Sequence, residues 1–433
     1  MDQATCSGCH FDLLPDDVLI TIFSFLTLYE RLLVMRTVSK RCYRILSSPQ
    51  VWTHVDFWQE QRLTVNQQWD VARNWTGRCG KTWAFPKDIY SILDFLQKYT
   101  SGSLKTIYLT VVNKEILTYL KKNCGNLEII SFHSASDPPQ TADIGDKSLT
   151  SHDIMPLPNT IKFCEFSVNF NLWTMLLQSF AQCKNLRGLS VHFMVITTEV
   201  CVALSKLTEL SVLNMYVDSR DELNNGVHLT RQATAMLPLY KLTKLKSFTL
   251  FGCSFNRIIR QHTFQRTSNI DINRFFCAIV GKWQELRCMR LVQTNALSSK
   301  TFALLTSTLT QLQVLELHGE TITDDKIILI AKHLKNLTTL KLLNGDNYTP
   351  TGLRVLSGHP SIERLHLVHQ RYHRMQQLEW LWSVYDVILS LPKIVYVILT
   401  GDMLKELHRS EMHVKIPELA KNIHIEVVPV IYL

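Results

Sequence analysis

The residues best suited to metal chemistry stand near the N-terminus, where Cys6, Cys9 and His10 form a C-x-x-C-H string. Thiolates and imidazoles at this spacing can bind zinc, but no second pair of ligands follows at the usual distance. A haem-attachment role would require an exported protein. We therefore predict a flexible tail over residues 1–10 and no metal site there.

A second group of candidate ligands comprises His366, His369 and His373. Only His366 falls on an expected strand, and the other two share a loop with Arg371 and Arg374, so the group does not predict a metal site. The strings G-x-x-x-x-G-K-[ST], G-x-G-x-x-G, G-x-S-x-G and H-E-x-x-H are absent from the sequence. Because no nucleophile stands with a paired base, we predict a protein that is not an enzyme and has no cofactor.

A basic loop over residues 253–275 carries Arg257, Arg260, His262 and Arg266. Guanidinium groups pair planar oxyanions bidentately, so the loop is suited to an acidic or phosphorylated partner. Charge is also uneven along the chain: residues 1–60 have a net charge of −2, whereas the whole chain is +9 and the remainder is therefore +11. Such a surplus favours acidic partners; the alternative is a solvated loop and a surplus that serves only solubility.

The elements that must position these side chains follow from a repeated pattern, L-x-x-L-x-L with apolar replacements. Three steps between residues 286 and 362 measure 26, 25 and 25 residues, and intervening stretches such as 299–309 and 324–334 have helical spacing of apolar residues. Repeats of this length stack into a solenoid. Ten copies begin at Leu104, Leu127, Leu186, Leu210, Leu245, Leu286, Leu312, Leu337, Ile362 and Ile394, with a weaker copy at Ile161.

Side chains alternate along a strand, so the residues flanking the second and third apolar positions point to the concave face. Aromatic and Arg side chains anchor many protein interfaces, and this face is rich in both. It is therefore our candidate substrate-binding surface, and a face without a partner is the alternative. With two residues of the basic loop, the candidates are Tyr108, His192, Tyr216, Phe251, Arg257, Arg260, Arg290, His318, Lys341, Arg364, His366 and Tyr396.

Residues 14–58 predict a short helical module. Pro15 suits the first helical position, acidic residues follow in the first turn, and Thr27 with Glu30 forms a capping box that starts a second helix. A third helix is expected over 38–46. About 45 residues bury too little apolar surface to pack all their apolar side chains inward. Some of these side chains must therefore meet another surface, unless the module is simply a helical cap on the domain that follows.

This segment resembles an F-box, the motif that binds the adaptor Skp1 in cullin-based ubiquitin ligases. Leu14-Pro15 followed by Ile22-Phe23-Ser24-Phe25-Leu26 is the specific part of the match, and the sequence departs from the usual pattern at Ser39, often Cys, and Cys42, often Trp. The later repeats resemble intracellular leucine-rich repeats. The residues that the F-box resemblance implies for Skp1 binding are Leu14, Pro15, Val18, Leu19, Ile22, Phe23, Leu26, Leu32, Val38 and Trp52.

The two resemblances imply an α/β chain: a three-helix F-box followed by a curved solenoid with parallel strands on its concave face and helices on its convex face. We expect a tail at 1–10, the F-box at 11–58, a linking helical segment at 59–103 and repeats with a C-terminal cap at 104–433. The implied function is substrate recognition in a Skp1–cullin–F-box ubiquitin ligase, which reaches a cullin and a RING protein through Skp1. A repeat scaffold without ubiquitin transfer and a small-anion sensor are the alternatives.

Composition bounds the location of the protein. No run of about 18 apolar residues is present, and the first residues do not form a signal peptide. The last residues lack a prenylation signal, and eleven scattered cysteines fit free thiols in a reducing compartment. We therefore expect the cytoplasm, the nucleus or both, with no membrane anchor and no nucleic-acid partner.

Overall fold

The structure is a computed structural model, and the chain divides into two compact units, residues 1–186 and 187–433. The N-terminal C-x-x-C-H string and the basic-loop residues Arg257 and Arg260 lie outside the residues that the structure describes. The predicted loop over 253–275 is wrong at its end, because a helix over Asn269–Ile279 already begins there. The described residues are 13–28, 30–35, 38–57, 89–100, 102–109, 114–133, 157–167, 179–180, 182–193, 196–217, 235–251, 269–292, 297–318, 322–343, 347–368, 377–400 and 423–428.

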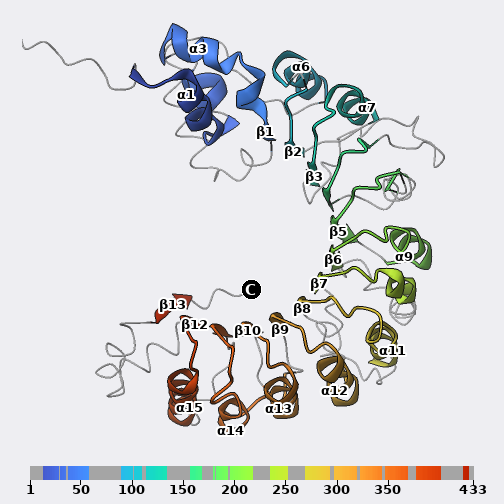
Figure 1. Ribbon diagram of the computed structural model, residues 1–433, viewed down its shortest axis with the longest axis vertical. Helices are drawn as coiled ribbons and strands as arrows, with labels where there is room; N and C mark the ends of the chain where they lie inside the picture. The colour runs from blue at the N-terminus through green and yellow to red at the C-terminus, as the bar shows by residue number, and fades with distance from the viewer. Residues whose placement is uncertain are drawn as a thin grey trace, which may run out of the picture. The chain divides into compact units, whose positions relative to one another are not determined.

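Unit 1 combines the N-terminal helices with a parallel sheet (Figure 1). Its strands are hydrogen-bonded in sequence order, β1 to β2, β2 to β3 and β3 to β4. The elements are α1 (Asp16–Ser24), the π-helix η2 (Glu30–Met35), α3 (Lys40–Leu46), the 3-10 helix η3 (Pro49–Trp52), β1 (His54–Asp56), α6 (Ile89–Tyr99), β2 (Thr106–Leu109), α7 (Lys114–Asn123), β3 (Ile129–His133) and β4 (Phe163–Ser167).

The first two helices begin where the sequence predicts. α1 follows Pro15, and Asp16 and Asp17 occupy its first turn, where the helix dipole favours negative charge. The predicted capping box is confirmed: the Thr27 amide donates to Glu30 Oε2 at 2.8 Å, and the Glu30 amide donates to Thr27 Oγ1 at 3.1 Å. The box therefore fixes the turn from α1 into η2.

The third helix begins two residues later than predicted. We expected it from Val38, but α3 starts at Lys40 because Ser39 is its cap. The Ser39 hydroxyl accepts a hydrogen bond from the Cys42 amide at 3.1 Å, which satisfies one of the free donors of the first turn. Ser39 replaces the usual Cys of the motif it resembles, and the structure gives this departure a role.

The repeat sheet begins earlier than predicted, directly after the N-terminal helices. β1 pairs with β2 so that Val55 is in register with Ile107. Trp52, Val55 and Phe57 therefore form one more copy of the L-x-x-L-x-L pattern, and all three side chains are buried. The predicted start of the strands after Leu104 is wrong, because this copy was taken entirely as part of the helical module.

Unit 2 is a parallel sheet whose helices all lie on one side of the strands (Figure 1). Its strands also pair in sequence order from β5 to β13. The elements are β5 (Gly188–Phe193), α9 (Thr198–Leu204), β6 (Val212–Val217), the 3-10 helix η5 (Leu237–Lys241), β7 (Ser247–Phe251), α11 (Asn269–Ile279), β8 (Cys288–Val292), α12 (Ser299–Thr308), β9 (Val314–His318), α13 (Asp324–His333), β10 (Thr339–Leu343), α14 (Pro350–Arg354), β11 (Arg364–Val368), α15 (Gln377–Ser390), β12 (Tyr396–Thr400) and β13 (His424–Val428).

The repeated apolar positions form the core of unit 2. Leu315, Leu340 and Leu365 are in register on successive strands and are at most 1% exposed. Side chains alternate between this core and the opposite side of the sheet, as the burial pattern of β9 and β10 shows. The strands of the predicted copies contain the second and third apolar positions, as Leu315 and Leu317 on β9 show. The helices predicted at 299–309 and 324–334 are confirmed to within a residue.

A carboxylate bridge links two neighbouring repeats of unit 2. Asp324, at the start of α13, accepts hydrogen bonds from the Thr349 amide at 2.7 Å and from Thr349 Oγ1 at 2.6 Å. Thr349 in turn caps α14 by accepting a bond from the Gly352 amide. A Cβ on Gly352 would lie 1.9 Å from Asp324 Oδ1, so glycine is required here by the close approach of this carboxylate.

Candidate protein-interaction surfaces

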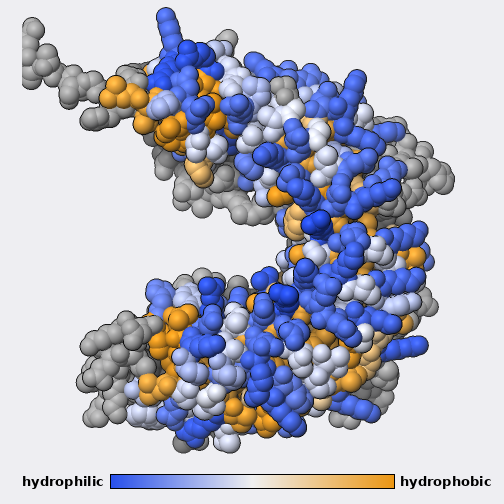
Figure 2. All heavy atoms as spheres, in the orientation of Figure 1, coloured by the Kyte–Doolittle hydropathy of each residue, from blue (hydrophilic) through white to orange (hydrophobic). Residues whose placement is uncertain are grey.

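The N-terminal helices expose apolar side chains on one face of α1 and at its C-cap, Phe25. Val18 is 42% exposed, Ile22 is 38% exposed and Phe25 is 84% exposed, at helical spacing, whereas Leu19 and Phe23 are fully buried. Figure 2 shows hydrophobic residues gathered around this N-terminal end of unit 1. We call these exposed residues, together with the other exposed apolar side chains of the F-box helices, the F-box apolar surface; it consists of Leu13, Val18, Ile22, Phe25, Val38 and Tyr43.

The residues predicted for Skp1 binding divide into surface and core positions. Pro15, Val18, Ile22 and Val38 are exposed, and Leu14, Leu26 and Leu32 are partly exposed. Three members are buried in the core of the helical module rather than exposed on its surface: Leu19, Phe23 and Trp52. Leu13 and Phe25 are exposed but absent from the prediction, although the helical spacing of Phe25 from Ile22 was visible in the sequence.

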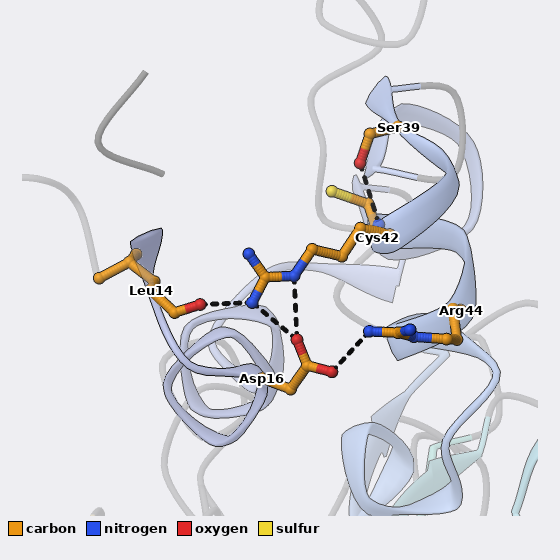
Figure 3. Close-up of polar contacts among 6 residues, drawn as sticks. Leu14, Asp16, Ser39, Cys42 and Arg44 are labelled. Carbon is orange, nitrogen blue, oxygen red and sulfur yellow. Dashed lines mark hydrogen bonds and ion pairs between the residues drawn. The ribbon is translucent and has the colours of Figure 1, made fainter. Parts of the chain in front are cut away.

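Asp16 fastens the first helix to the third (Figure 3). Its Oδ1 accepts hydrogen bonds from Arg41 Nε at 2.9 Å and Nη2 at 2.7 Å, and its Oδ2 accepts from Arg44 Nη2 at 2.8 Å. Arg41 also donates to the Leu14 carbonyl oxygen. The hydrogen bond from Arg41 is the main cause that holds the pKa of Asp16 below its usual value. These contacts hold the start of α1 in a defined position, so its exposed face has a fixed orientation.

Arg31 joins the helices to the first strand of the sheet. The residue is 4% exposed, Nη1 donates to the Val51 carbonyl at 2.8 Å, and Nη2 donates to the His54 carbonyl at 3.1 Å. The guanidinium lies 5.1 Å from the Trp52 ring centroid. Burial lowers the pKa of Arg31 to about 10, which leaves it charged at neutral pH. The F-box helices and the beginning of the sheet are therefore one continuous packed body within unit 1.

The side of the unit 2 strands opposite the helices carries most of the predicted substrate-binding residues. We call it the open face. Tyr108 lies on β2 of unit 1, and His192 lies on β5 but its side chain is outside the described part of the chain. The predicted residues on the open face are Tyr216, Phe251, Arg290, His318, Lys341, Arg364, His366 and Tyr396.

Four charged or titratable side chains are in register across this face. Arg290, Glu316, Lys341 and His366 occupy equivalent positions on β8, β9, β10 and β11. Neighbouring strands lie about 4.8 Å apart, so side chains at equivalent positions are within reach of one another. The register therefore brings together residues that are separated by up to three repeats in the sequence.

Glu316 is the centre of this row. Its side chain is 13% exposed; Oε1 lies 3.1 Å from His318 Nε2, and Oε2 lies 3.4 Å from Lys341 Nζ and 3.7 Å from Arg290 Nε. Burial alone would raise the pKa of Glu316, but the hydrogen bond from His318 and the charges of Lys341 and Arg290 outweigh it and lower the pKa. One carboxylate thus serves three basic side chains.

Aromatic side chains flank the charged row on both sides. The Tyr216 and Phe251 rings are 5.5 Å apart on β6 and β7, and Phe251 is 40% exposed. On the later strands, Tyr396 lies 5.6 Å from His366 and is stacked on His424 at 5.3 Å. The open face therefore combines aromatic and basic groups, the two classes that most often anchor protein interfaces.

Among the residues that the structure describes, no three His, Cys, Asp or Glu side chains are grouped to hold a metal ion. His366 contacts Tyr396, and His369 and His373 lie outside the described ranges. The seven cysteines in the described part of the chain are free thiols. None of the helices in the described ranges has the length and hydrophobicity needed to cross a membrane.

Residues 11–58 match the family model described as F-box-like. No curated protein matches the chain. Among solved structures, an internalin (InlF) from Listeria monocytogenes is similar with 15% identity and a TM-score of 0.39, covering 72% of this chain and 70% of that chain. The yeast Rad7 and Elc1 complex is similar with 11% identity and a TM-score of 0.38, covering 71% and 79% respectively.

The structure of a TLR13–ssRNA13 complex is similar with 14% identity and a TM-score of 0.30, covering 69% of this chain and 46% of that chain. Likeness at these identities and TM-scores assigns no function. The fold follows from the strands themselves, which are parallel, paired in sequence order and separated by helices. The chain therefore has an F-box-like region at residues 11–58, followed by an α/β leucine-rich-repeat fold.

Proposed function

We propose that the protein is the substrate-recognition subunit of a Skp1–cullin–F-box ubiquitin ligase. The observation that carries this proposal is the exposure of Val18 and Ile22 on α1 and of Phe25 directly after it, within the region that matches the F-box-like family. Contiguous exposed apolar side chains mark interaction sites, because leaving them in water forgoes the free energy of burial. A Skp1-type adaptor is the partner that would cover them.

The two surfaces have separate roles in this proposal. The F-box apolar surface, with Leu14, Pro15, Leu26 and Leu32, contacts Skp1 and through it a cullin and a RING protein. The open face contacts the protein substrate, in the cytoplasm, the nucleus or both. The chain would act by positioning, since a tethered substrate meets the ubiquitin-charged enzyme at high effective concentration. This role requires neither a catalytic residue nor a cofactor in the chain itself.

Affinity capture of the tagged full chain from cells tests the proposal. We expect Skp1 and a cullin to be captured together, and both to be lost when Leu14 and Pro15 are changed to Ala. Capture of proteins without Skp1 and cullin would favour the alternative of a repeat scaffold that acts without ubiquitin transfer. Capture of Skp1 that is unaffected by the double substitution would contradict the assigned interface.

A further inference from the structure

The open face between β8 and β11 has an excess of positive charge. At the outward positions of these strands, the described residues include three cations, Arg290, Lys341 and Arg364, and one carboxylate, Glu316. The net charge of these four groups is therefore +2, with His318 and His366 counted as neutral. Because the strand register fixes this excess within one patch, it attracts an acidic partner to a defined place.

The cations of this patch retain free hydrogen-bonding capacity. Arg364 is exposed, and its guanidinium makes no hydrogen bond or ion pair with any residue that the structure describes. The closest contact of Arg290 with Glu316 is from Nε to Oε2 at 3.7 Å, too long for a strong hydrogen bond, and the Arg290 side chain is 44% exposed. The terminal nitrogens of both residues are thus available to pair with oxyanions, which guanidinium groups bind in a bidentate way.

An exposed aromatic group lies next to the basic patch. Phe251 packs against Tyr216 and lies one strand before Arg290 and three strands before Lys341. Its register partner on β8 is Val292, two residues beyond Arg290. Three strand spacings of about 4.8 Å, together with about 7 Å along the strand, place Lys341 about 16 Å from Phe251. An extended chain covers that distance in about five residues. A segment that places an apolar side chain on Phe251 would therefore present its acidic groups to Lys341 about five residues away.

We propose that this patch binds an extended acidic segment of a partner protein. The segment carries carboxylate or phosphate groups that pair with Arg290, Lys341 and Arg364, and an apolar side chain that packs on Phe251 and Tyr216. Naming the segment as part of a ubiquitination substrate rests on the proposed function. The central carboxylate of Glu316 and the aromatic neighbours favour a peptide over a nucleic-acid backbone, since a face for polyphosphate gains from uninterrupted positive charge.

Fluorescence anisotropy of labelled short peptides, titrated with the purified full chain, tests the proposal. The probe has a Leu and, about five residues later, two phosphoserines in a Gly-Ser background. One control peptide has unmodified serines, and another has Ser in place of Leu. We expect the probe to bind more tightly than either control, with an affinity that falls as salt rises. Absence of binding, or equal binding of all three peptides, overturns the proposal.

Three substitutions separate recognition from structure. Arg364→Glu should weaken probe binding by about tenfold or more, because it replaces a charge-assisted pair with repulsion. Glu316→Gln should bind the probe at least as tightly as the natural chain, because it removes the only carboxylate among the described residues of the patch. The control Arg274→Glu, which makes the same charge change at an exposed position on α11, should leave binding unchanged.

The same preparations distinguish this proposal from the proposed function. The peptide site is overturned if Arg364→Glu and Arg274→Glu weaken probe binding equally. It is also overturned if Glu316→Gln weakens probe binding as much as Arg364→Glu does. Tighter binding of a single-stranded oligonucleotide, abolished by Arg364→Glu, also overturns it in favour of nucleic acid. Skp1 capture measured on each sample is independent: its loss with peptide binding intact refutes only the ligase assignment.

Discussion

Gly352→Ala gives a sharp test of the repeat packing, because local propensity and tertiary structure predict opposite signs. Ala favours a helix over Gly by about 1 kcal/mol, so propensity alone predicts stabilisation of α14. The structure instead places the new Cβ 1.9 Å from Asp324 Oδ1 and 2.3 Å from Asp324 Cγ. The short Asp324 side chain accepts hydrogen bonds from the amide and the hydroxyl of Thr349. It cannot move away from the new methyl group without breaking these two bonds.

The magnitude follows from the two hydrogen bonds that would be lost. Each bond to an ionised acceptor contributes about 1.5–3 kcal/mol, and the propensity gain offsets about 1 kcal/mol of the total. We expect Gly352→Ala to lower the free energy of unfolding by about 2–5 kcal/mol. Urea denaturation of the full chain, followed by circular dichroism, measures this change. A stabilised Gly352→Ala variant would refute the account of this contact.

Two controls isolate the contact between Gly352 and Asp324. Gly281→Ala should change the unfolding free energy by less than about 1 kcal/mol, since nothing lies within 4 Å of the new methyl group. In a chain that already carries Asp324→Gly, Gly352→Ala should cost nothing further, because the three side-chain atoms of Asp324 that lie within 3 Å of the new methyl group are gone. An equal cost in both backgrounds would show that the clash has another origin.

Two further outcomes are expected. Trp52→Ala should lower the unfolding free energy by about 3–5 kcal/mol because Trp52 is fully buried. Phe25→Ala should change it by less than about 0.5 kcal/mol because Phe25 is 84% exposed. Similar values for the two variants in urea denaturation would contradict the assignment of Trp52 to the core and Phe25 to the surface. Burial lowers the pKa of Lys326 to about 8, so its charge opposes folding below pH 8 and this effect fades as pH rises toward 10.5. Lys326→Met should therefore stabilise the protein by about 3 kcal/mol at pH 7 and by much less at pH 10.5; a gain independent of pH in thermal melts would contradict the burial argument.

Much of the fold was predictable because the apolar residues recur at fixed spacing. The pattern from Leu312 to Leu342 predicts both the strands and their mutual register, since successive copies differ by one repeat. The copy formed by Trp52, Val55 and Phe57 was missed because the F-box resemblance already accounted for Trp52. Trp52 fits both the F-box pattern and the repeat pattern, and only the pairing of β1 with β2 shows that it begins a repeat.

The candidate surfaces were predictable only in part. Alternation along the strands correctly places Arg290 and Lys341 on the open face. It does not show that both lie next to Glu316, because that depends on the distances between side chains from three repeats. Around α1, helical periodicity predicts an apolar stripe but not its division into buried Leu19 and exposed Phe25, which depends on how η3 and α3 pack against the helix.

The most direct test of the central claim is the affinity of Skp1 for the full chain, measured by isothermal titration calorimetry on two matched variants. Val18 on α1 and Val202 on α9 are both valines and both 42% exposed. We predict that Val18→Glu weakens Skp1 binding by at least about tenfold, because a charge would be buried in an apolar interface, and that Val202→Glu leaves it unchanged. No binding of Skp1 to the natural chain, or equal effects of the two substitutions, would contradict the account.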